Sequence, residues 1–288
     1  MSLKKYIKAL LIYGIVMSIF IILSLTLGLS ERESHGYLMF SPFDSSGLDT
    51  IYAILMITIA SIIGALIFGY ILGPLFLLAH KKIIGRKMIY GIQERPEPKI
   101  FKKYFLMSLF PSLMAINFAL IYCFDPSIQR IVVLNPQDKM AAMFTFIGLL
   151  AIMTGIAFGA FSPVWFLLDS GIVYTNKEKV KDTAHPIEVR SVGGWYIYLL
   201  KGYAGISVIL SFYTFFISIY AIIGPSNLFV GMNIMFLIFF PIMPLFVAIL
   251  TIPALVLLDI TRSNRKKFIL KFASKLGIKE PLKDPFAE

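Results

Sequence analysis

Charged side chains are scarce in this sequence. Asp, Glu, Lys and Arg together account for only 15% of the 288 residues, whereas 58% are hydrophobic and the mean hydropathy is +0.82. A soluble domain is usually about a quarter charged and about half apolar. The shortage of charge therefore excludes an ordinary soluble domain and predicts an all-α, polytopic membrane protein.

Cysteine is almost absent as well, because Cys123 is the only one. A single thiol cannot form an intrachain disulfide, and zinc or iron–sulfur sites need several ligands. The apolar runs carry no Asp, Glu, Lys, Arg or His at mid-depth, which argues against a buried proton relay or an intramembrane metalloenzyme. Glycine-rich phosphate loops and ordered Ser/His/Asp sets are missing too. We therefore predict no cofactor and no metal, and rank a lipid-acting membrane enzyme third among the functions.

What the sequence does contain is long uncharged runs. A helix needs about 20 apolar residues to cross a bilayer. The run 202–258 is too long for one span and divides at the turn formers of 224–227. We predict six transmembrane helices: Ala9–Ser30, Ile51–Ala79, Tyr104–Phe124, Met140–Leu168, Tyr196–Ile223 and Leu228–Leu258.

The basic residues lie in alternate segments. Segments 1–8, 80–103, 169–201 and 259–288 hold 24 of the 27 Lys and Arg residues, and the other connections hold three. Basic loops stay in the cytoplasm, so both termini are predicted there, in a multi-pass protein of the cell membrane. We assign the net charge of +11 to orientation and to anionic lipid head groups. Nucleic acid is not expected as a partner, because no basic segment is large enough to fold separately.

A pattern recurs at the ends of the even-numbered helices. A proline is followed six residues later by a strongly polar residue, in the pairs Pro74 and His80, Pro163 and Asp169, and Pro253 and Asp259. We interpret residues 1–260 as one membrane domain of three tandem helical hairpins, about 1–90, 98–180 and 190–265, around a pseudo-threefold axis. The alternative is that prolines and polar exit residues are simply common in membrane helices.

If the repeat is real, His80, Asp169 and Asp259 occupy equivalent positions and form a cytoplasmic polar ring. Two carboxylates and an imidazole have the composition of a metal or cation site. They could equally gate a pore by pairing with Lys81, Lys201 or Arg262. The competing interpretation is that they mark where helices leave the lipid.

Two further features concern packing and the tail. The pairs Gly69/Gly73 and Gly155/Gly159 have the spacing that lets membrane helices approach closely, and we interpret them as packing residues. Residues 261–288 form a basic amphipathic tail, in which Phe268, Ile269, Phe272 and Leu276 share one helical face. This pattern predicts a helix lying on anionic lipid. Continuation of helix six and contact with a partner are the alternatives.

Three two-helix repeats with prolines near helix ends resemble the architecture of mitochondrial carriers. Their Pro-x-Asp/Glu-x-x-Lys/Arg signature lies on the odd helices, whereas the prolines here lie on the even ones. The resemblance is one of plan and does not assign the chain to that family.

The leading functional hypothesis is a transport protein: a channel, a facilitator or the membrane subunit of a transporter. It predicts a cavity between helices two, four and six, and tight sealing of these helices by Leu and Phe would argue against it. The alternative is a non-catalytic scaffold or accessory subunit that binds lipid, another membrane protein or further copies of itself.

Overall fold

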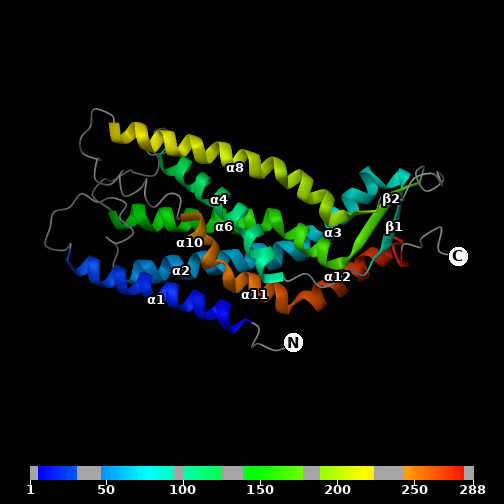
Figure 1. Ribbon diagram of the computed structural model, residues 1–288, viewed down its shortest axis with the longest axis horizontal. Coiled ribbons are helices and arrows are strands. Elements are labelled where there is room, and N and C mark those ends of the chain that lie inside the picture. The colour runs from blue at the N-terminus through cyan, green and yellow to red at the C-terminus, as the bar shows by residue number, and fades with distance from the viewer. Residues whose placement is uncertain are drawn as a thin grey trace.

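The computed structural model describes residues 6–30, 47–93, 100–124, 139–177, 189–223 and 243–281, and these are mostly helical (Figure 1). The helices are α1 (Ile7–Ser30), α2 (Gly47–Ile62), α3 (Gly69–Ile83), α4 (Ile100–Phe124), α6 (Lys139–Ser170), α8 (Val192–Ile223), α10 (Met243–Leu250), α11 (Ile252–Ile260) and α12 (Arg262–Lys275). A π-helix, η3 (Ile63–Phe68), joins α2 to α3, and a short 3-10 turn, η4 (Gly85–Lys87), follows α3. The all-α class fits this architecture.

The helices coincide with the predicted apolar runs to within a few residues at most ends. Among the described residues, two helical segments are long and apolar enough to cross a membrane, Ile51–Ile83 and Ile147–Ser170. The apolar segments Ile7–Ile22 and Met107–Phe118 are shorter. Much of the last predicted span, including residues 228–242, lies outside the described residues.

Helix α6 is the centre of the bundle. It contacts α2, η3, α3, α4, α8 and α12, which surround it (Figure 1). Its Phe158, Trp165 and Phe166 side chains are fully buried, together with Leu77 of α3 and Leu258 of α11. The second, fourth and sixth predicted spans correspond to α2–α3, α6 and α10–α11. In the described part of the chain, aromatic and branched aliphatic side chains therefore fill the space between these helices.

Glycines allow α6 to approach its neighbours closely. A Cβ placed on Gly64 would lie 2.3 Å from the carbonyl oxygen of Gly155, and one on Gly69 would lie 2.2 Å from the Phe166 ring. A Cβ on Gly159 would come within 3.3 Å of Phe68. The interpretation of Gly69, Gly73, Gly155 and Gly159 as packing residues is confirmed. The π-helix begins at Ile63, one residue before Gly64, whose neighbour on α6 is a backbone atom.

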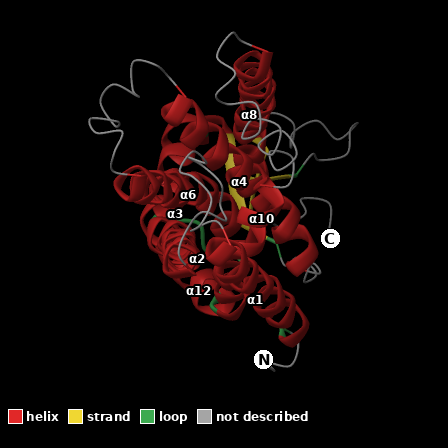
Figure 2. Cartoon of the chain, turned by 90° about the vertical axis from the view of Figure 1, so that its left-hand side faces the viewer, coloured by secondary structure: helices red, strands yellow, loops and turns green. Residues whose placement is uncertain are grey.

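The outer surface of the bundle is apolar. On α2, η3 and α3 every fourth residue from Ile51 to Leu75 is a Leu or Ile that is between 39% and 54% exposed. Exposed Ile and Leu residues also line α1, and Ile, Leu, Phe and Tyr residues line α8. We call these exposed faces of α1, α2–α3 and α8 the apolar belt. Looking along the bundle, Figure 2 places α1 and α8 at opposite edges of it.

Many polar side chains on the described helices point inward instead. Ser61, Ser108, Ser112, Asn117, Thr154 and Ser162 are among those that are fully buried. Several donate to the carbonyl of the preceding turn, as Thr154 Oγ1 does to the oxygen of Leu150 at 2.7 Å. A soluble bundle normally has the opposite pattern, with charged and polar residues outside and large exposed apolar patches uncommon.

A small sheet, which the sequence did not predict, closes one end of the bundle. Strand β1 (Met88–Ile92) pairs antiparallel with β2 (Ile172–Asn176), which pairs antiparallel with β3 (Arg190–Ser191). Ile92 also forms a parallel bridge with Pro281. We call the three strands and residues 278–281 the platform. Its strands come from two of the segments that the sequence assigns to one side of the membrane, 80–103 and 169–201, and residues 278–281 come from a third. The strands meet at the same end of the bundle (Figure 1).

The turn from α6 into β2 requires glycine. Gly171 has a φ of +72°, a region that favours glycine, and a Cβ there would lie 2.5 Å from the carbonyl oxygen of Gln93. The amide of Gln93 donates to the carbonyl of Gly171 at 3.0 Å. The end of α6 is therefore bound directly to the strand that follows α3.

The three prolines of the predicted repeat have different local surroundings. Pro74 and Pro163 lie inside α3 and α6, whereas Pro253 lies in the first turn of α11, after a break at Thr251. Proline fits a first turn because the amide it lacks has no partner within the helix there. The third proline thus begins a helix, while the first two lie within one.

Helix α12 packs on the protein itself. It contacts α6 and α3, and its buried residues are Arg265, Ile269 and Ala273. Of the four residues predicted to face lipid, Ile269 is fully buried against Gly73, whereas Phe268 is 41% exposed. The buried stripe is therefore rotated from the predicted apolar face, and the lipid contact of the tail stays a prediction.

Candidate functional site

The three residues of the predicted polar ring are all buried, with 1% of His80, 7% of Asp169 and 3% of Asp259 exposed. Each has a different set of neighbours. Among the described residues there is no group of three or more His, Cys, Asp and Glu side chains placed to hold a metal ion. The described part of the chain therefore gives no support to a metal site at the ring.

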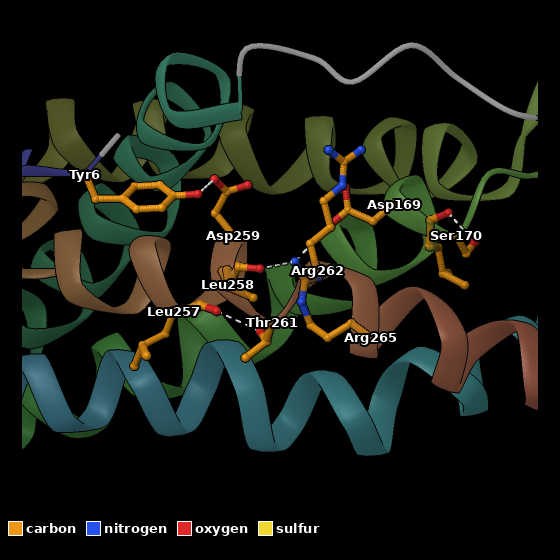
Figure 3. A network of polar contacts seen from close by, with 10 residues as sticks. Tyr6, Asp169, Ser170, Leu257, Leu258, Asp259, Thr261, Arg262 and Arg265 are labelled. Carbon is orange, nitrogen blue, oxygen red and sulfur yellow. Dashed lines mark hydrogen bonds and ion pairs between the residues drawn. The ribbon is translucent and has the colours of Figure 1, made fainter. Parts of the chain in front are cut away.

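Asp169 forms a buried ion-pair junction with α12 (Figure 3). Its Oδ2 accepts from Nη2 of Arg265 at 2.9 Å, and its Oδ1 lies 3.4 Å from Nε of Arg262. Nη2 of Arg265 also donates to the carbonyl oxygen of Leu258, and the guanidinium lies 4.8 Å from the centre of the Phe166 ring. One carboxylate thus serves two guanidiniums. Arg262 is one of the three bases that the sequence proposed as a partner for the ring.

Helix ends position this junction. Asp169 lies in the last turn of α6, where the helix dipole disfavours an acid. Arg262 and Arg265 lie in the first turns of α12, where the dipole disfavours a base. The ion pairs offset both costs because the two helix ends meet. Sequence reasoning treated Arg265 as part of a basic amphipathic tail that lies on anionic lipid, although its spacing of three from Arg262 would have indicated a shared helical face.

Asp259 binds a different element. The hydroxyl of Tyr6, which is 2% exposed, donates to its Oδ2 (Figure 3). This bond ties the start of α1 to the end of α11, and Tyr6 and Val256 also belong to one apolar cluster. A tyrosine hydroxyl buried in a core normally finds such a partner. No pattern in the sequence paired these two residues, which are 253 positions apart.

His80 belongs to an aromatic cluster beneath the platform. Its Nδ1 lies 2.9 Å from the hydroxyl of Tyr90, and the rings of Tyr174 and Trp195 pack against it at 4.7 Å and 4.9 Å between centroids. Its Nε2 is buried without a hydrogen-bond partner. The cluster therefore joins α3, β1, β2 and α8.

The ionisation of Tyr90 is fixed by its surroundings. Burial raises the pKa of its hydroxyl well above the ordinary value of 10.0, and the charge of Tyr174 raises it further. The phenol therefore stays protonated across the physiological range, and it can donate one hydrogen bond. It acts as a neutral link between β1 and α3.

The described polar contacts hold elements together. The contacts of Asp169, Asp259 and His80 each connect one of the predicted even-numbered spans to another segment. They join α6 to α12, α11 to α1, and α3 to β1. Comparison of the chain with protein family models, with curated proteins and with solved structures finds no significant match. A function has to be argued from the geometry alone.

Proposed function

We propose that this chain is a multi-pass integral membrane protein with six spans and both termini in the cytoplasm. The observation that carries the proposal is the apolar belt, combined with the inward direction of the polar side chains. Water would leave the belt unstable and prone to association, whereas hydrocarbon solvates it. Backbone groups satisfied within helices and serine or threonine bonds inside the bundle also suit a bilayer.

The proposed orientation draws on the platform. Two of the four segments that are rich in Lys and Arg, 80–103 and 169–201, supply its strands. The basic end of the bundle is therefore also a folded end. Residues of opposite predicted sidedness would have had to cross the bundle to pair. The pairing of 88–92 with 172–176 supports the same side for both segments, and positive charge favours the cytoplasm.

We propose a non-catalytic role within the membrane, as a scaffold or accessory subunit. Its support is the filled interior: Phe158, Phe166 and Leu77 occupy the region where a pathway between the even-numbered helices was expected. His80, Asp169 and Asp259 are engaged in contacts between elements. Such an architecture presents two surfaces to other molecules, the apolar belt within the bilayer and the platform outside it.

Transport, the leading hypothesis from the sequence, becomes the second candidate, and one observation favours it. The second predicted span contains the π-helix η3. π-helical turns often mark functional positions. In this proposal the three hairpins would move relative to one another to open a route.

Isolation of the protein from its native membrane separates these candidates. We expect polymer discs to extract the full chain together with a second membrane protein, or with further copies of the chain, at a fixed ratio. Extraction of single copies alone would contradict the accessory role. The purified chain should also leave ion-loaded liposomes sealed, and protein-dependent release of a solute would favour transport.

A further inference from the structure

The ion-pair junction at the end of α6 has more donors than acceptors. Asp169 is the carboxylate that both Arg262 and Arg265 contact, and the Asp259 carboxylate is directed to Tyr6 instead (Figure 3). Nη1 of Arg262 and both Nε and Nη1 of Arg265 are buried without a hydrogen-bond partner. Buried charged donors without partners are rare and costly, and an anion is one of the few groups that can satisfy several of them.

The surroundings of the junction favour negative charge. It lies at the N-terminus of α12, a helix of 14 residues with no acidic residue in its first turn. Helix N-termini attract anions, because their amides and dipole are positive there. Lys271 and Lys275 follow on the exposed side of α12, four residues apart. Arg265 is fully buried, whereas 17% of the Arg262 side chain is exposed and gives the junction an edge at the surface.

We propose that Arg262 and Arg265 form a binding site for a phosphate group, with Asp169 holding the two guanidiniums in place. Guanidinium suits this ligand because its fork of N–H donors matches the oxygens of a phosphate. The inference rests on the proposed membrane location, since the junction then lies at the cytoplasmic surface, where anionic lipids are concentrated. The phosphate can belong to a lipid head group or to a free phosphate anion, and the two share this chemistry.

Full-length protein in lipid nanodiscs provides the test. Nanodiscs of phosphatidylcholine receive increasing fractions of phosphatidylglycerol, and lipids retained by the protein are counted by native mass spectrometry. Inorganic phosphate is titrated separately, with thermal unfolding as the readout. Arg262→Gln is the main variant because this side chain is partly exposed, and Lys267→Gln, on the exposed side of the same helix, is the matched control.

We expect phosphatidylglycerol to bind at saturable occupancy. Arg262→Gln should weaken this binding about tenfold, because it removes a charge-assisted hydrogen bond to the phosphate. Lys267→Gln should change it less than about twofold, in line with the small contribution of exposed charges. Binding of phosphatidylglycerol identifies a lipid ligand, and binding of inorganic phosphate alone identifies a free anion. Either result supports the site if Arg262→Gln weakens it selectively.

Equal losses for Arg262→Gln and Lys267→Gln, or no saturable binding of either probe, would overturn the inference. The nanodiscs keep this outcome separate from the proposed membrane location. If the chain enters the discs and binds no phosphate, only the phosphate site is contradicted. If the chain stays soluble outside the discs, the proposed membrane location is contradicted.

Discussion

Replacing Asp169 by leucine is expected to lower the free energy of unfolding by about 3–5 kcal/mol. The substitution removes the carboxylate that Arg265, which has no exposed surface, contacts. Removal of one partner from a buried ion pair typically costs this much, because the remaining charge is still desolvated. Thermal or denaturant unfolding in detergent micelles measures the change.

A double substitution provides the control for this prediction. Asp169→Leu combined with Arg265→Met should recover most of the lost stability, since an apolar pair of similar volume can replace a buried ion pair at little cost. Arg262 can turn toward water in that variant, because part of its side chain is already exposed. If Asp169→Leu alone is as stable as the parent protein, the junction contributes little to the attachment of α12.

The Gly64→Ala variant is expected to lose about 3 kcal/mol of stability, at the upper end of the usual cost of overpacking. The new Cβ would lie 2.3 Å from the backbone oxygen of Gly155, and no side-chain rotation can relieve a contact with backbone. The π-helix must therefore move away from α6. The loss of stability in micelles, followed by circular dichroism during heating, tests this expectation.

Gly148→Ala, on the central helix α6, is the control. A Cβ on Gly148 has no atom within 4 Å outside its own helical turns. Alanine also has a higher helix propensity than glycine, so this variant should be as stable as the parent protein or slightly more stable. Equal stability of the two variants would mean that the contact between η3 and α6 is not as close as described.

Most of the helices were predictable from sequence because they contain long apolar runs. The runs Ala9–Ser30 and Tyr104–Phe124 correspond to α1 and α4, with ends within a few residues. The platform was not predictable in the same way. Its strands have at most five residues, and their pairing joins segments about 80 positions apart, from Tyr90 to Tyr174. Short strands carry too few residues for a periodic signal.

The candidate site was predictable in its location but not in its contacts. The spacing from Pro163 to Asp169 and from Pro253 to Asp259 led to two carboxylates that are indeed buried. Their actual neighbours, Arg265 and Tyr6, come from the two terminal regions of the chain, which only tertiary packing brings to the helix ends. A basic residue in a terminal tail is usually exposed to solvent. The burial of Arg265 could therefore not be inferred from the composition of the tail alone.

Cysteine labelling in sealed membranes tests the central proposal most directly. In a Cys123→Ser background, single cysteines replace Ile59, Ile67 or Ile209 on the apolar belt, and Lys87, Lys177 or Lys279 near the platform. All six positions are exposed in the structure. A charged, membrane-impermeant maleimide should label the three platform cysteines from the cytoplasmic side only. The belt cysteines should stay unlabelled from both sides, because lipid covers them. Rapid labelling of the belt, equal to that of the platform, would contradict the account.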